Sequence, residues 1–94
     1  MKKIPRRDKM KVYGDLLSEL RDENRNKGER VVLTHVQVRI RVPYDRLKTY
    51  IMELKELGLI QDENSLELTE KGKEYLREYE TVLEFMKRMG LTYR

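Results

Sequence analysis

Apolar and polar positions in the middle of the chain follow the period of an amphipathic helix. Apolar side chains recur after four, three and three positions, a spacing that places them on one helix face. They are Leu47, Ile51, Leu54 and Leu57. Gly58 comes next, where a helix C-terminus favours a residue that accepts a positive φ. The pattern predicts a helix over residues 43–57, with one face buried in a core and the other open to a partner.

The segment before this helix has two interpretations. Four β-branched residues alternate with polar ones, which is typical of a half-buried strand. However, Thr34 and Gln37 have the spacing of a capping box, which marks a helix start, and Val36 and Ile40 lie one helical turn apart. We expect a helix over residues 34–41, because a strand would leave the following helix without its helix-turn-helix partner.

The remaining pattern predicts one helix before this pair, and a hairpin and a long helix after it. In chain order these elements are a helix from Asp8 to Gly28, a short strand at 31–33, a β-hairpin at 59–68 whose turn is 62–65, and a helix capped by Thr69 that ends at Gly90. The expected organisation is a basic flexible arm over 1–7, a helix-turn-helix domain over 8–72, a C-terminal helix over 69–90 and a tail over 91–94. The expected fold class is mostly α, with the hairpin as an α+β element.

Length and composition limit the protein to one small domain. The chain has 94 residues, of which 38% are hydrophobic and 40% charged. A surface with this many charged residues is typical of a thermophilic protein, in which ion-pair networks are favoured, but also of an ordinary solvated helical protein. There is no cysteine, and the basic N-terminus is not followed by an apolar run. We therefore expect no disulfides, no membrane partner and a cytoplasmic location.

The positive charge of the chain is concentrated in two segments. Residues 1–11 carry a net charge of +5 and residues 35–50 carry +3, whereas residues 51–80 carry −5. A basic arm near a probe-like helix is the footprint that a phosphate backbone would select. The alternative is a basic tail beside an ordinary solvated helix face.

The order of elements, and two motifs within it, resemble a known family. Leu54-x-x-Leu57-Gly58-Leu59-Ile60 and Leu68-Thr69-x-x-Gly72 look like archaeal winged helix-turn-helix DNA-binding proteins. The closest type is the small one whose C-terminal helix dimerises as a coiled coil. The resemblance implies a transcriptional regulator or small chromatin-like binder that binds double-stranded DNA, with residues 43–57 as the recognition helix and the hairpin as the wing.

Candidate DNA contacts follow from this placement. Base and phosphate contacts are expected from the first half of the recognition helix, backbone contacts from the helix before it and further grip from the arm. The recognition-helix residues are Tyr44, Arg46, Lys48 and Thr49. The residues of the preceding helix are Arg39 and Arg41, and those of the arm are Lys2, Lys3, Arg6 and Arg7. The hairpin turn at 62–65 departs from the family pattern, in which the tip of a DNA-contacting wing carries Arg or Lys. The turn here is acidic and would repel phosphate.

The last helix carries an apolar seam that exceeds the needs of one small core. Its steps of four, three, four and three from Tyr75 to Met89 are those of a coiled coil. The alternative is that the whole stripe packs on the domain's own core. We expect a homodimer, whose interface residues are Tyr79, Val82, Phe85, Met86 and Met89.

Nothing in the sequence points to catalysis. His35 is the single histidine and no cysteine accompanies it, so we expect no metal site and read His35 as a surface residue of a first helical turn. No nucleophile–base set and no glycine-rich phosphate loop is visible, and we expect neither an enzyme nor a cofactor. The rival function is a protein-interaction module within a larger complex, docking through the acidic residues 51–80.

Overall fold

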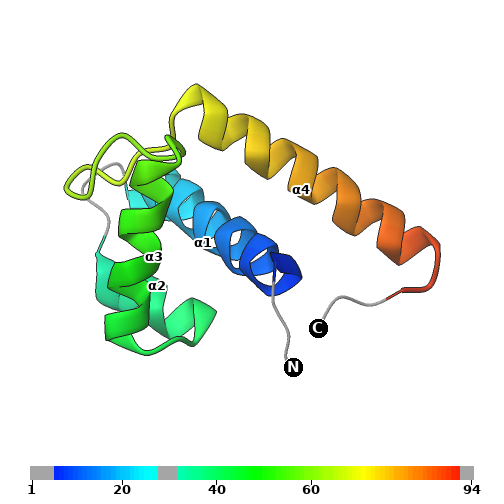
Figure 1. Ribbon diagram of the computed structural model, residues 1–94, viewed down its shortest axis with the longest axis horizontal. Coiled ribbons are helices and arrows are strands. Elements are labelled where there is room, and N and C mark those ends of the chain that lie inside the picture. The colour runs from blue at the N-terminus through cyan, green and yellow to red at the C-terminus, as the bar shows by residue number, and fades with distance from the viewer. Residues whose placement is uncertain (1–5, 28–31, 92–94) are drawn as a thin grey trace.

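The computed structural model describes residues 6–27 and 32–91, and it is built from helices (Figure 1). They are α1 (Arg6–Lys27), α2 (Leu33–Ile40), α3 (Tyr44–Glu56) and α4 (Glu70–Arg88). Helix α1 lies in the middle and contacts α2 on one side and α4 on the other, while α3 packs against α2.

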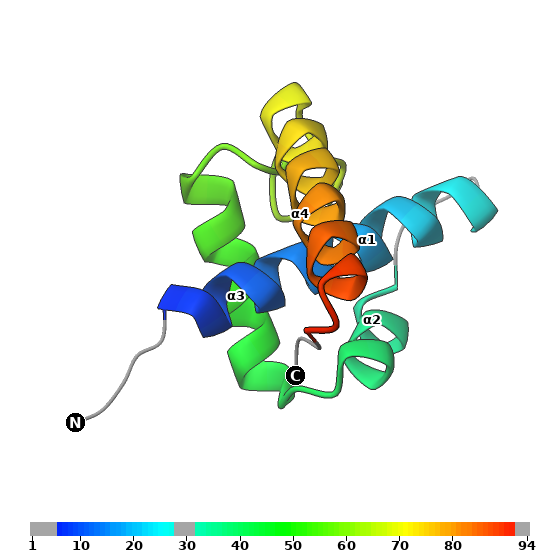
Figure 2. The ribbon, with the colours of Figure 1, turned by 90° about the vertical axis from the view of Figure 1, so that its right-hand side faces the viewer.

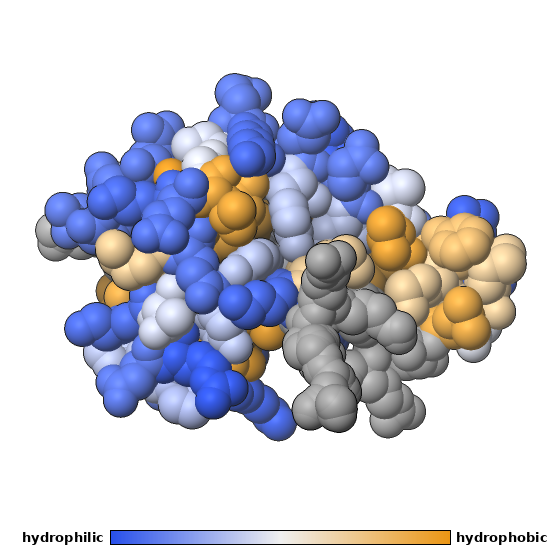
Figure 3. Space-filling model, in the orientation of Figure 1, coloured by the Kyte–Doolittle hydropathy of each residue, from blue (hydrophilic) through white to orange (hydrophobic). Residues whose placement is uncertain are grey.

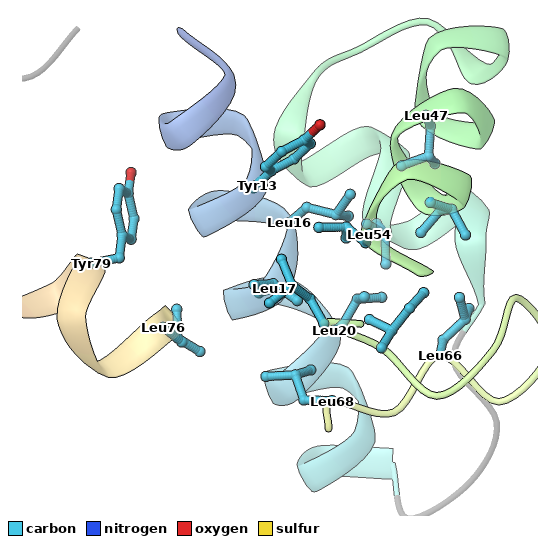
Figure 4. Packing of buried hydrophobic residues seen from close by; sticks show 14 residues of the cluster. Tyr13, Leu16, Leu17, Leu20, Leu47, Leu54, Leu66, Leu68, Leu76 and Tyr79 are labelled. Carbon is cyan, nitrogen blue, oxygen red and sulfur yellow. The ribbon is translucent and has the colours of Figure 1, made fainter. Parts of the chain in front are cut away.

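The core is formed by leucine side chains that α1 presents to the other elements (Figure 4). Leu16, Leu17 and Leu20 are fully buried, as are Leu47 and Leu54 of α3. Burial of each such side chain stabilises the fold by roughly 1.5–3 kcal/mol. Leu47, Ile51 and Leu54 are buried, as the helical period predicted. The fourth residue of the predicted stripe is not: Leu57 follows the helix as its C-cap and is 45% exposed.

The segment expected as a helix over 34–41 is helical through Ile40, but the start of the helix differs from the prediction. The N-cap of α2 is Val32, and no side chain caps the helix, so the predicted capping box is wrong. Leu33 is the first residue of α2, so this residue is helical and not part of the strand expected at 31–33. Val31 lies outside the described residues. Arg41 ends α2 in the left-handed region, with φ 58°.

The outer helices also depart from the prediction in detail. Helix α1 already includes Arg6, so Asp8 lies within the helix and does not cap it. Thr69 does cap α4, because its hydroxyl accepts the Gly72 N–H at 3.0 Å. The same hydroxyl donates to the Gly58 carbonyl at 2.6 Å. This fixes the start of α4 against the end of α3, where Gly58 has the expected positive φ of 78°.

The predicted β-hairpin is wrong, and with it the expected α+β fold class. Between α3 and α4 the described chain forms an irregular loop, residues 57–69, in which Ile60 and Leu68 make one isolated antiparallel bridge. Two features of the loop are incompatible with a longer run of paired strand residues. The Asp62 carboxylate accepts the N–H groups of the second and third residues after it, both at 2.7 Å, which makes a tight turn. Leu66 takes a left-handed φ of 58° and is buried to 3% exposure, so its backbone cannot continue an extended strand.

Helices α1 and α4 cross each other (Figure 2). Gly14 of α1 lies against the Tyr79 ring of α4. A Cβ atom at position 14 would lie within 3.0 Å of three ring atoms of Tyr79. The Tyr79 hydroxyl donates to Asp15 at 3.1 Å, and the Tyr75 hydroxyl donates to the Met10 carbonyl at 2.9 Å. Beyond Tyr79, α4 extends past the body of the molecule (Figure 1).

Candidate nucleic-acid interface

Helix α3 lies at the edge of the molecule and exposes the face opposite its buried leucines (Figure 1). The four residues expected to touch DNA from this helix are all exposed; they are Tyr44, Arg46, Lys48 and Thr49. The exposed surface of the helix carries all four, and we call this surface the α3 outer face.

Two of these side chains already have local contacts. The Lys48 ammonium lies 5.8 Å from the centre of the Tyr44 ring, a cation–π distance. The Thr49 hydroxyl donates to the Asp45 carbonyl at 3.2 Å, so part of its hydrogen-bonding capacity is used within the helix. Among the described residues, Arg46 and Lys48 form no ion pair, which leaves both charges available to an anion.

Met52 also belongs to the α3 outer face, and the sequence analysis missed it. It lies one helical turn after Lys48 and is 44% exposed, close to the 43% of Tyr44. Its spacing of four residues from Lys48, off the Leu47–Ile51–Leu54 stripe, was a signal that could have found it.

A hydrogen-bonded cluster ties the start of α1 to α3. The Glu53 carboxylate accepts the Tyr13 hydroxyl and is contacted by the Lys9 ammonium at 3.3 Å to each oxygen. The Tyr13 hydrogen bond, helped by Lys9, holds the pKa of the Glu53 carboxyl below its ordinary value. Burial, with the Glu53 contact, raises the pKa of the Tyr13 hydroxyl. Glu53 therefore remains ionised, but Lys9 offsets its charge at the border of the α3 outer face.

A shallow hollow of about 470 Å³ lies between the start of α1 and the first half of α3. Its lining includes Lys9, Arg46, Thr49 and Tyr50, and Tyr50 meets the Tyr13 ring edge-on at 6.3 Å. The start of α1 is thus fixed beside the α3 outer face. Lys2 and Lys3 lie outside the described residues, while Arg6 and Arg7 form the first turn of α1.

The basic residues of the α2 end are placed less favourably. Arg39 lies 3.8 Å from Glu19 of α1, so its charge is partly compensated within the protein. Arg41 is exposed at the end of α2. His35 is in the first turn of α2, half-exposed as expected, and its Nδ1 lies 3.9 Å from the buried Glu23.

The loop 57–69 carries negative charge next to the end of α3. Lys55 contacts Glu63 at 2.8 Å, and this contact holds the pKa of the Glu63 carboxyl below its ordinary value. Hydrogen bonds from the backbone N–H groups of Ser65 and Asn64 lower the pKa of the Asp62 carboxyl. Both acids therefore stay ionised, and Lys55 offsets the charge of Glu63.

The second half of α4 exposes three of the five residues predicted to form a dimer seam. Val82, Phe85 and Met89 are 37%, 49% and 56% exposed, and Met86 is partly buried. Figure 3 shows apolar residues gathered at this end of the molecule. Tyr79 is 5% exposed and packs in the domain's own core.

The described residues show no grouping of side chains suited to a metal ion. None of the described helices is long and apolar enough to cross a membrane.

One comparison with known proteins gives a match, and it spans these helices. Residues 6–87 match the winged helix-turn-helix family, and this range includes every helix except the last residue of α4. Neither the curated proteins nor the solved structures give a significant match. Since the family match covers most of the chain, the protein belongs to the winged helix-turn-helix family.

Proposed function

We propose that this protein binds duplex DNA as a homodimer and regulates transcription, with α3 as the recognition helix in the major groove. The observation that carries the proposal is the α3 outer face, where Arg46 and Lys48 are exposed on a winged helix-turn-helix scaffold. A helix of this kind fits the width of the major groove, and the first half of a recognition helix is the part that usually touches base edges.

The basic start of α1 supports the same orientation. Lys9 is held beside α3 through Glu53, and the residues that precede it include four more Lys or Arg. With α3 in the groove, Lys9 at the start of α1 would lie near a flanking phosphate backbone.

The exposed half of α4 supports the dimer. Val82, Phe85 and Met89 would remain in water in a monomer, whereas a partner helix would cover them and contribute roughly 1.5–3 kcal/mol for each fully buried side chain. A symmetric dimer also doubles the DNA surface and matches palindromic sites.

A salt titration of binding to random duplex DNA tests the proposal. If the dimer neutralises about six phosphates, the logarithm of the binding constant falls against the logarithm of salt concentration with a slope near −5. Absence of binding at about 50 mM salt would refute the proposal. It would favour the rival role of protein interaction through the acidic loop 57–69.

Variants then test the placement of the DNA surface. We expect Lys48→Ala and Arg46→Ala to weaken binding severalfold while leaving the melting temperature nearly unchanged, because both side chains are exposed. The matched control is Glu63→Ala at the loop, which removes an exposed charge of opposite sign and should not weaken binding. A larger loss from Glu63→Ala than from Lys48→Ala would contradict this placement.

A further inference from the structure

Two large apolar side chains stand on the surface that is proposed to face DNA. Tyr44 and Met52 are 43% and 44% exposed, and Lys48 lies midway between them at intervals of four residues. Residues four apart share one face of a helix, so the three side chains form a single stripe along the α3 outer face. The buried face of the same helix is occupied by Leu47, Ile51 and Leu54.

The chemistry of the major groove offers such a stripe one apolar partner. Base edges there present hydrogen-bond donors and acceptors, and the single apolar group among them is the 5-methyl group of thymine. Methionine is long, unbranched and polarizable, so it can follow an irregular surface. The neighbouring Lys48, free of carboxylate partners among the described residues, supplies the charge that holds the stripe near the phosphates.

We propose that Met52 is a specificity-determining residue that contacts thymine 5-methyl groups and gives the protein a preference for A·T base pairs. The inference rests on the proposed function. Along a helix axis Met52 lies about 6 Å from Lys48, which is about two base pairs, so a contact at Lys48 leaves Met52 over neighbouring bases. The stripe ends one turn later at Glu56, an exposed acid that repels the phosphate backbone.

The experiment compares two duplexes that differ in the methyl group alone. Alternating A·T and alternating A·U duplexes of about 20 base pairs are titrated by fluorescence anisotropy at one salt concentration. We expect the unmodified protein to bind the A·T duplex more tightly, by roughly fourfold for each methyl group that is covered. Met52→Ala should remove most of this ratio while changing affinity for the A·U duplex little, and Met52→Leu, of similar volume, should retain it.

The control is Leu57→Ala, which shortens a side chain that is 45% exposed just beyond the helix and off the stripe. It should leave the A·T to A·U ratio unchanged, and circular dichroism confirms that each variant is folded. Equal affinity of the unmodified protein for both duplexes overturns this inference but leaves DNA binding intact. A ratio that survives in Met52→Ala overturns the assignment to Met52, whereas absence of binding to either duplex overturns the proposed function itself.

Discussion

Replacement of Gly14 by alanine tests the close contact that sets the crossing of α1 and α4. In the middle of a helix this change normally stabilises, because alanine is favoured over glycine by about 1 kcal/mol. Here the added methyl group would lie within 3.0 Å of the Tyr79 ring, and its nearest neighbours include the Cγ atom, which a rotation of the ring cannot move away. The ring or one of the helices must therefore shift.

The expected cost follows from what the shift disturbs. One extra methyl group in a packed core costs about 1–3 kcal/mol, and loss of the Tyr79–Asp15 hydrogen bond costs about 1 kcal/mol more. After subtraction of the helix-propensity gain, Gly14→Ala should lower the free energy of unfolding by roughly 1–3 kcal/mol. For a domain of this size the melting temperature should fall by roughly 4–24 °C.

Thermal melts and urea titrations followed by circular dichroism at 222 nm measure this loss. All variants are compared at one protein concentration, because dimerisation would make stability depend on it. The control is Gly14→Ala in a Tyr79→Ala background, kept folded with an osmolyte. With the ring absent, the same substitution should stabilise by about 1 kcal/mol. A rise in melting temperature for Gly14→Ala in the unmodified chain would refute the close contact.

Three further predictions concern charge, capping and assembly. The folded pKa of the Glu53 carboxyl lies below its ordinary value, chiefly because of the Tyr13 hydrogen bond. Its contribution to stability is therefore present above about pH 5 and lost as pH falls through the folded pKa. Tyr13→Phe removes this hydrogen bond, so in urea titrations the variant should lose less stability than the parent between pH 6 and pH 3. Thr69→Ala removes the cap of α4 and should cost about 1 kcal/mol in a thermal melt, while Thr69→Ser should be nearly neutral. Val82→Glu combined with Met86→Glu should give a folded monomer with weaker DNA affinity, and light scattering of the unmodified protein at a mass near 11.4 kDa across the micromolar range would contradict the dimer.

The helical period was enough to predict α3, because its three core residues recur on one face and Gly58 supplies the terminal positive φ. It was not enough for α2. There, alternation favoured a strand, whereas the turn-spaced Val36 and Ile40 and the helix-turn-helix context favoured the helix that the structure shows. Val36 is fully buried in the core, and packing against α1 resolves the ambiguity. The cap predicted at Thr34 was wrong because Val32 precedes the helix without any side-chain bond.

The predicted hairpin was wrong because strand propensity does not show which side chains of a short loop pack into the core. Residues 59–68 have a turn sequence between apolar runs, yet the bridge at Ile60 and Leu68 stays isolated. Leu66 is buried in the core while its backbone lies in the left-handed region. Local pattern favours extension at this residue, and tertiary packing overrides it.

Some features of the candidate interface depend on local spacing in the sequence, and others depend on contacts between residues far apart in the chain. Exposure of Tyr44 and Lys48 was predictable, because residues off a buried stripe face outward. The contact of Glu53 with Lys9 joins residues 44 positions apart, and the pairing of Arg39 with Glu19 joins two helices. No local spacing signals such pairs, since they depend on the angle at which α1 crosses its neighbours.

The sequence by itself determined the order of helices, the buried face of α3 and the segments of positive charge, because each depends on spacing along the chain. Only the tertiary structure decided that the loop 57–69 lacks strands, that Tyr79 is used within the core and that Lys9 contacts Glu53. Each of these outcomes depends on which surfaces α1 buries, and therefore on the packing of elements that are far apart in the sequence.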